Sequence, residues 1–225
     1  MPTRAEVRVL QLGQQRVAQM ARNDLSDWWY SLDKTDLTAL RAEVEAFFPQ
    51  LVESYGEVAF TAAADWYDLI YRERPRMAAG MRNEDIARAR ARWAIGKAWQ
   101  GDAAQALSTL SLVADEMVRQ FGRDTVTRSA AANKRMWARV PAGSHTCAFC
   151  LTMASRGFAY HTQETAGAGV SKFHGDCDCE IVPDDGTVPG GYDPDALYEQ
   201  YKSVHAHGDT ASDVALKLRR KYGLK

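Results

Sequence analysis

The chain of 225 residues has no cysteine outside one short stretch, because all four of its cysteines lie between residues 147 and 179. It also has no apolar run that approaches the roughly 18 residues of a membrane-spanning helix. Its N-terminus is charged and amphipathic and lacks the apolar core of a signal peptide. We therefore expect a protein kept in a reducing cytosol, where clustered cysteines indicate metal or redox chemistry instead of disulfides.

Net charge is nearly absent as well. The sequence holds 28 Lys and Arg against 29 Asp and Glu, so its formal net charge is −1. No global attraction to nucleic acid or to a membrane surface follows from that balance. The segment from Asp176 to Glu199 has eight acidic residues and neither Lys nor Arg, which disfavours a polyanionic substrate near it. Contact with nucleic acid is left open but not indicated, and no membrane partner is expected.

Apolar residues recur at helical spacing through roughly the first 135 residues. Thr35 or Asp36 is suited to cap the start of one long helix. Pro49 is expected to kink this helix or split it in two, because proline lacks the amide hydrogen that a helix interior requires. The apolar positions follow the interval of three and four residues that forms one buried helix face: Leu37, Leu40, Val44, Phe47, Leu51, Tyr55, Val58, Ala62, Trp66 and Leu69.

Two further helices are expected before residue 135. One should run from about Glu84 to Trp99, and the next should start after Asp102, which can cap it. Gly122 is a candidate interruption of that second helix. The tryptophans of this region stand at helical phase and are expected to pack in the core or between helices: Trp28, Trp29, Trp66, Trp93 and Trp99.

The character of the sequence changes after residue 140. Turn-forming and Gly-rich segments flank the run CDCEIVP, whose alternation predicts a short strand closed by proline. Later helices should start near Asp193 and near Ser212. The expected fold is mainly α, with a helical region over residues 1–135, a small α+β cysteine and histidine module over 136–190, and a helical tail over 191–225.

The cysteines form two pairs, C-x-x-C at Cys147 and Cys150 and C-x-C at Cys177 and Cys179, with His174 just before the second pair. A C-x-x-C on a tight turn directs two sulfurs toward one ion. Residues two apart on a strand share a face, so the second pair would converge too. These spacings predict a structural Zn²⁺ site with four ligands. They are compatible with four thiolates, or with three thiolates and the His174 imidazole.

Other chemistries have less support. A redox C-x-x-C normally opens a helix in a βαβ unit, which the sequence does not show, and Leu151 stands where haem attachment requires histidine. Neither H-E-x-x-H nor G-x-S-x-G occurs, so we expect no enzyme. A zinc nuclease would need a further histidine, for which His161 is the spare candidate. The other ionisable groups are expected at the surface or in loops: Glu164, Asp176, Glu180, His145, His205 and His207.

The sequence around the cysteines resembles the MuF-like minor head proteins of tailed bacteriophages. The resemblance covers roughly residues 120–185 and extends more weakly to the run SYGEVAFTAAADWYD. The widespread form has Pro after the histidine and Arg between the last cysteines, whereas this chain has Gly175 and Asp178, like the versions in phages of actinobacteria. The matching residues are Cys147, Cys150, Leu151, Gly157, His174, Cys177 and Cys179.

That resemblance implies a minor capsid protein of head morphogenesis, present in the virion or procapsid and assembled in the host cytoplasm. The implied partners are portal, coat or scaffold proteins, and a homo-oligomer stays open. Some relatives are described as capsid maturation proteases, so a protease or a zinc-dependent nuclease of head maturation is the rival interpretation. A helical toxin or regulator with a zinc knuckle is a third.

Overall fold

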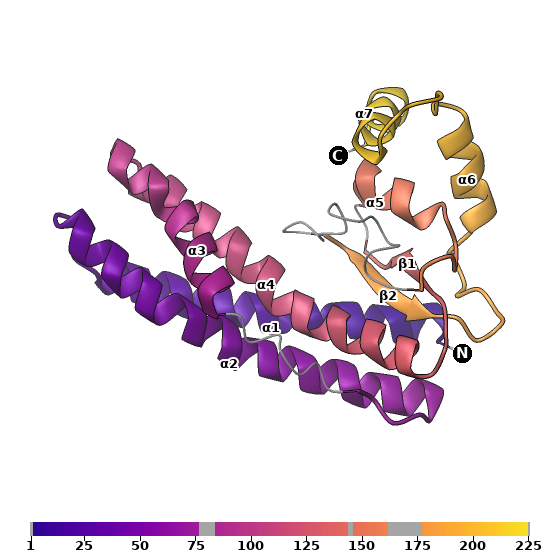
Figure 1. Cartoon of the computed structure of the whole chain (residues 1–225), viewed down its shortest axis with the longest axis horizontal. Coiled ribbons are helices and arrows are strands. Elements are labelled where there is room, and N and C mark those ends of the chain that lie inside the picture. Colours follow the sequence, from indigo (N-terminus) through magenta and orange to yellow (C-terminus); the bar gives the residue numbers. More distant parts are fainter. Residues whose placement is uncertain (1, 77–83, 144–145, 162–176, 225) are drawn as a thin grey trace.

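The computed structural model describes residues 2–76, 84–143, 146–161 and 177–224. A long helical arm carries a smaller module of short helices and strands against one of its ends (Figure 1). The N-terminus lies at the module end of the arm, so the first helix starts beside the module (Figure 1). The mainly α fold expected from the sequence is confirmed.

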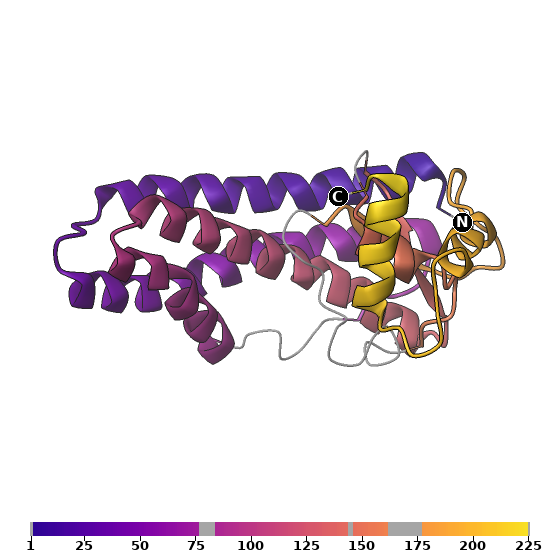
Figure 2. The same cartoon turned by 90° about the horizontal axis from the view of Figure 1, so that it is seen from above.

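Three long helices build the arm: α1 (Arg4–Ser31), α2 (Leu37–Tyr71) and α4 (Ala103–Ala132). Figure 2 shows α1 and α4 side by side along the arm. The apolar faces of all three helices meet in one core. None of the helices in the described ranges has a stretch long and apolar enough to cross a membrane. Each long helix starts at a side chain that accepts hydrogen bonds from its first amide groups: Thr3, Asp36 and Asp102.

Pro49 does not divide α2, which runs without a break from Leu37 to Tyr71. A proline inside a helix costs about 3 kcal/mol because one hydrogen bond is lost. The residues around Pro49, such as Phe48 and Val52, are buried in the core of the arm and offset that loss. Gly122 does not interrupt α4 either. A Cβ atom at this position would clash with the Gln14 side chain of α1, so the glycine allows the two helices to come close. The expected interruption at Gly122 and a split at Pro49 were therefore wrong, while a kink at Pro49 stays a prediction.

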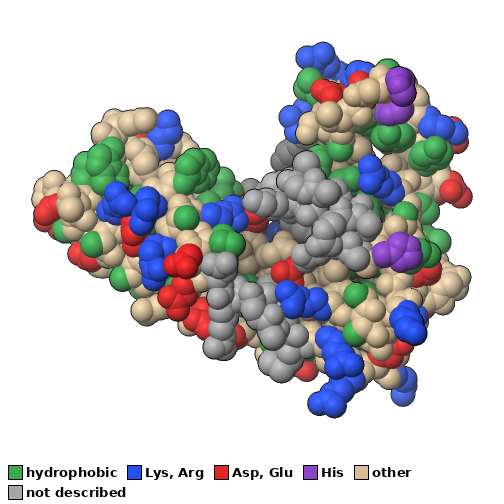
Figure 3. Space-filling view, viewed as in Figure 1, with side chains coloured by type: hydrophobic (Ala, Val, Ile, Leu, Met, Phe, Trp, Pro, Cys, Tyr) green, Lys and Arg blue, Asp and Glu red, His purple; other side chains and the backbone are tan. Residues whose placement is uncertain are grey.

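The shorter helix expected after residue 83 divides into α3 (Glu84–Ala94) and a 3-10 helix, η1 (Ile95–Gln100). Alanines form its contact with α2 and α4, since Ala87, Ala91 and Ala94 are buried. The packing prediction was wrong for Trp93 and Trp99, which are 71% and 47% exposed. Figure 3 shows hydrophobic side chains at the surface toward the end of the arm that lies away from the module.

The module combines a two-stranded antiparallel sheet with three short helices. Strand β1 (Trp137–Pro141) pairs with β2 (Cys179–Pro183). Helix α5 (Ala148–Ala154) packs against β1, while α6 (Pro194–Lys202) and α7 (Ala211–Tyr222) pack against α5. The late helices start where the sequence predicted them, and the predicted strand is β2; strand β1 was missed.

A second core cluster lies where the arm meets the module. It joins side chains of the arm, such as Trp66 and Tyr67, to Trp137 and Ile181 of the two strands. Three of the cysteines belong to the same cluster: Cys150, Cys177 and Cys179. The cysteines therefore lie at the junction between arm and module, while the domain boundaries near residues 135 and 190 stay a prediction.

Candidate metal centre

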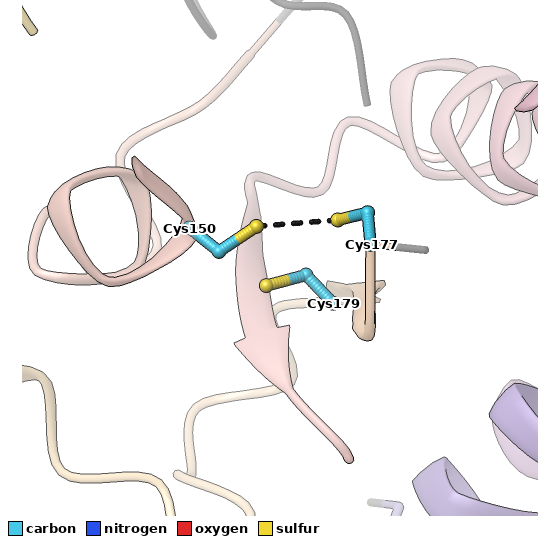
Figure 4. Close-up of side chains that lie close together, drawn as sticks. All are labelled: Cys150, Cys177 and Cys179. Carbon is cyan, nitrogen blue, oxygen red and sulfur yellow. Dashed lines mark hydrogen bonds between the residues drawn. The ribbon is translucent and has the colours of Figure 1, made fainter. Parts of the chain in front are cut away.

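Three cysteine side chains converge between α5 and β2. Figure 4 shows Cys150 on α5 directed toward Cys177 and Cys179, which stand just before and at the start of β2. The three sulfur atoms lie within 4.8 Å of one another, and those of Cys150 and Cys177 are 3.2 Å apart. Each of these residues has at most 1% of its surface exposed. Three buried thiols this close together could hold a metal ion.

Helix α5 positions the first cysteine pair. Cys147 caps this helix, and its sulfur accepts a hydrogen bond from the Cys150 amide at 3.3 Å. At the other end, the hydroxyls of Tyr160 and Tyr192 donate to the last two carbonyl oxygens of the helix, each at 2.6 Å. The C-x-x-C pair thus opens a short, firmly held helix, whereas the sequence predicted only a tight turn.

The sulfur spacing fits a shared ion better than a disulfide. Zn–S bonds of about 2.3 Å at tetrahedral angles place neighbouring sulfurs about 3.8 Å apart. A disulfide needs a separation of about 2.05 Å. None of the four cysteines forms a disulfide, and the 3.2 Å between the sulfurs of Cys150 and Cys177 lies closer to the value for a metal centre. The disulfide alternative therefore has little support from the geometry.

The three converging thiols differ in acidity. Hydrogen bonds with the other cysteine thiols raise the pKa of the Cys150 thiol. The hydrogen bond with Cys147 has the largest effect, and burial adds to the rise. Hydrogen bonds with Cys150 and Cys179 lower the pKa of Cys177. A hydrogen bond with Cys150 lowers the pKa of Cys179, but one with Cys177, together with burial, raises it well above the ordinary value. Cys177 is therefore the thiol of the group whose pKa is lowered, and a bound metal ion would displace the protons of the cysteines that bind it.

Three buried arginines surround the C-x-C segment. Arg119 and Arg123 lie one turn apart on α4, Arg139 comes from β1, and each is at most 2% exposed. Arg119 and Arg123 both donate to the Cys177 carbonyl oxygen, and Arg123 also donates to the Cys179 carbonyl oxygen at 3.2 Å. The Arg139 guanidinium donates to the Cys177 sulfur at 3.8 Å. These contacts fix the backbone of the segment and place positive charge beside the Cys177 sulfur, which favours its ionised form.

Glu180 adds a negative charge to this buried group of arginines, and we call the four residues together the polar layer. Its carboxylate lies 3.6 Å from the Arg119 guanidinium, close enough for an ion pair but too far for a good hydrogen bond. Burial raises the pKa of the Glu180 carboxyl, while Arg123 and Arg119 oppose the rise. The expectation of a surface carboxylate was wrong, because Glu180 is only 1% exposed. Every residue of β2 is buried, since α4 covers the strand on the side of the arginines.

Asp178 connects the two cysteine segments. Its carboxylate accepts a hydrogen bond from the Thr146 hydroxyl at 3.0 Å, and its carbonyl oxygen accepts one from the Ala142 amide at 3.2 Å. Gly143 leaves room for this carboxylate, since a Cβ atom at that position would come within 2.4 Å of it. Thr146 directly precedes Cys147, so Asp178 holds the start of α5 next to the C-x-C segment. This contact gives the aspartate between the last two cysteines a structural role.

Three of the five predicted donors come together, namely Cys150, Cys177 and Cys179. Cys147 is half-buried at the edge of this group, and its sulfur accepts the hydrogen bond from the Cys150 amide. His161 is exposed, as expected, and so are the two histidines between α6 and α7. Four residues considered in the sequence fall outside the described residues: His145, Glu164, His174 and Asp176.

The surrounding charges were not predicted. Arg119 and Arg123 offered one weak signal, because their spacing of four residues places them on one face of α4 next to the buried Val118 and Val126. Charged residues on a helix are usually exposed, so this signal alone does not reveal a buried layer. The two arginines of α4 are buried because β2 packs against this helix.

The VG15 protein family matches residues 1–204, a range that includes the arm, the cysteine centre and α6. No curated protein and no solved structure matches the chain. The family match supports the expectation of a phage protein, and it does not extend to a MuF-like minor head identity. Since the match covers most of the sequence, the chain belongs to the VG15 protein family, a family of phage gene products.

Proposed function

We propose that this protein is a MuF-like minor component of the phage head, which acts with the portal during procapsid assembly and carries a structural Zn²⁺ ion. The observation that carries the proposal is the convergence of three buried thiols within the segment that resembles those head proteins. Membership of a phage protein family supports it. The long arm would supply surface for contacts with portal, coat or scaffold proteins.

Zinc is the metal that this donor set suits best. Structural zinc sites take four thiolate or imidazole ligands, whereas Mg²⁺ and Ca²⁺ prefer oxygen. Cys150, Cys177 and Cys179 would supply three ligands, and either Cys147 or His174 would supply the fourth. A catalytic zinc keeps one position open to substrate, and thiols with at most 1% of their surface exposed leave little access for one. We accordingly propose a structural role without enzymatic activity.

Metal analysis of the purified chain tests the zinc site. Protein prepared without chelator should contain about one zinc ion per chain, as measured by inductively coupled plasma mass spectrometry. Cys150→Ser should lose that zinc. Comparison of Cys147→Ser with His174→Ala identifies the fourth ligand, because only one of the two should release the metal. Wild-type protein with less than about half an equivalent of zinc would contradict a four-ligand zinc site.

Particle composition tests the head role. In a phage that encodes this chain, mass spectrometry of purified procapsids should detect it together with the portal, and deletion of its gene should lower the yield of filled heads. Normal heads after deletion, or particles without the chain, would contradict the proposal. Cleavage of scaffold, coat or DNA that disappears in His161→Ala or Glu164→Gln would favour the rival hydrolase.

A further inference from the structure

Helix α3 and the 3-10 helix η1 carry apolar residues on two different faces. The inner face packs on α2 and α4 through buried alanines. On the outer face, Ile86 and Trp93 are 52% and 71% exposed. Ala89 and Gly96 are also exposed, and a Cβ atom at Gly96 would meet nothing within 4 Å. An apolar face that remains in solvent after the other face has packed indicates a surface for a further contact.

The exposed residues have the spacing of a seam between two packed helices. They recur at intervals of three, four and three residues, which keeps them on one side of the helix, as at the a and d positions of a heptad. Gly96 lies in η1, where about three residues complete a turn, so it stays in line with Trp93. Large and small residues alternate along this outer seam, which consists of Ile86, Ala89, Trp93 and Gly96.

A second copy of the outer seam matches these sizes when the two helices run antiparallel. If the pair is centred at the level of Ala91, each Trp93 meets Ala89 of the second copy, and each Ile86 meets Gly96 of the second copy. Large residues then face small ones along the whole seam, as close packing between helices requires. A parallel pair in register would instead set the two tryptophans against each other. The sizes therefore select the antiparallel arrangement.

The charges at the two ends of the seam favour the same orientation. Glu84 and Asp85 lie in the first turn of α3, and their side chains are 64% and 93% exposed although both pair with Arg88. Lys97 is exposed at the other end, where it donates to the Gln100 side chain at 3.1 Å. Antiparallel pairing brings the acidic end of each helix to the basic end of the other, whereas parallel pairing joins like ends.

The arginines beside the seam do not oppose the approach of a second copy. Arg90 donates to both carboxylate oxygens of Glu116 on α4, and Arg92 donates to both carboxylate oxygens of Glu45 on α2. Each positive charge next to the seam is thus paired within its own chain, which weakens repulsion between two copies. The module does not cover the seam either, because α3 lies on the part of the arm away from the module (Figure 1).

We propose that two copies of this chain associate through the outer seam, with their α3 helices antiparallel. Such a pair has twofold symmetry, so one patch serves both partners. The seam is short and offers two large side chains from each copy, so the buried area stays below the roughly 1,600 Å² of a standard stable interface. We accordingly expect a reversible dimer of micromolar affinity. The inference adds a contact between copies to the proposed head role, and it depends on neither the zinc site nor the head partner.

Sedimentation velocity of the purified full chain tests the dimer. Over a range of about 1 to 300 µM the wild type should pass from monomer to dimer. Trp93→Ala removes the largest side chain of the seam from both copies and should raise the Kd at least about thirtyfold. The matched control is Leu69→Ala on α2, which removes an apolar side chain that is 74% exposed and should leave the Kd unchanged.

An exchange of sizes tests the antiparallel register. Ala89→Trp alone sets two tryptophans against each other and should weaken the dimer at least about tenfold. When Ala89→Trp is combined with Trp93→Ala, each new tryptophan again meets an alanine of the other copy, so the Kd should return to within about threefold of the wild type. Both positions are exposed, so these variants should fold as the wild type does.

Several outcomes would overturn the proposal. These are a chain that stays monomeric over the whole range, an unchanged Kd in Trp93→Ala, an equal loss in Leu69→Ala, and a double variant that does not recover. A monomeric chain that binds purified portal or coat protein through Trp93 would overturn it as well, because the seam would then serve a different partner.

Discussion

The helical arm and the cysteine module are stabilised by different interactions. In the arm, most residues buried between the three long helices are apolar, and the largest of these, such as Trp29, Phe48 and Leu110, are at most 1% exposed. Gln14 is a buried polar exception, and it donates to the Ala59 carbonyl oxygen at 3.0 Å. In the module, two five-residue strands and short helices enclose thiols, arginines and a carboxylate. The arm thus depends mainly on the amount of apolar surface that it buries, whereas the module combines smaller apolar clusters with particular buried polar pairs.

Because of this difference, single substitutions should affect the stability of the two regions differently. Apolar packing is not directional, so losing one side chain weakens the arm locally. A buried charge that loses its partner has no water to replace it, so a single change can undo a whole polar layer. Around the cysteines that layer consists of Arg119, Arg123, Arg139 and Glu180. We therefore expect the module to be the less tolerant of the two regions.

The largest effect is expected from Cys150→Ser. In the proposed zinc site, loss of the Cys150 thiolate should remove several kcal/mol of folding free energy, because a structural ion contributes its binding energy to folding. Hydrogen exchange measured by mass spectrometry should accelerate in α5 and β2, while the middle of α1 and α2 stays protected.

Leu110→Ala is the matched change in the arm, where it should cost about 2–5 kcal/mol and accelerate exchange in α4 first. Unchanged exchange of β2 in Cys150→Ser would rule out a metal centre that stabilises the module. Simultaneous loss of protection in the arm would show that both regions unfold as one unit.

Arg123→Met should have the next largest effect. The substitution leaves the Cys177 and Cys179 carbonyl oxygens without this donor and removes a positive charge close to Glu180, at a cost of about 3–5 kcal/mol. Urea denaturation should show that its effect and that of Cys150→Ser are not additive, because both act on the same layer. Leu110→Ala and Cys150→Ser should instead add within about 0.5 kcal/mol. Additivity in both pairs would contradict a link between Arg123 and the cysteines.

The helices of the arm could be predicted from the sequence because apolar spacing and caps are local features. Asp36 and Asp102 cap the helices that were expected to follow them. The errors arose from contacts between elements: Val58 and Leu69 belong to the predicted buried face of α2, yet they are 52% and 74% exposed. Strand β1 was missed because a strand of five residues obtains its hydrogen bonds from a partner that is distant in sequence.

The converging cysteines could be predicted for the same reason. In C-x-x-C and C-x-C the spacing itself brings two sulfurs together, so three of the five donors were found in one group. The residues that position them could not be predicted, because Arg119 and Arg123 look like ordinary charges of a helix surface until β2 packs against them. Sequence patterns thus reveal ligands more readily than the charges that hold those ligands in place.

A smaller effect is expected from two glycines of the arm. A Cβ atom at Gly56 would come within 2.6 Å of the Phe121 ring, whereas one at Gly13 would meet nothing within 4 Å. Gly56→Ala should therefore destabilise the protein by about 1–3 kcal/mol through overpacking. Gly13→Ala should stabilise it by about 0.5–1 kcal/mol, because alanine favours helix. Urea denaturation gives the free energy of unfolding of each variant. If this free energy changed in the same direction in both variants, the result would contradict the close contact of α2 and α4.

The smallest effect is expected from Glu73→Gln, which weakens a pair that joins the arm to the module. Glu73 follows α2, Arg135 precedes β1, and the two side chains approach within 2.6 Å. The hydrogen bond from Arg135 lowers the pKa of Glu73 below its ordinary value of 4.5, so this contribution is present above pH 4.5 and is lost as pH falls through the lowered pKa. At neutral pH the variant should be less stable by about 1 kcal/mol at most, because both side chains are partly exposed. The difference in stability between Glu73→Gln and the wild type should vanish in acid. The control Glu84→Gln, which affects an exposed pair with Arg88, should change the stability little at any pH. A difference for Glu73→Gln that is constant with pH would mean that the carboxylate charge does not connect the two regions.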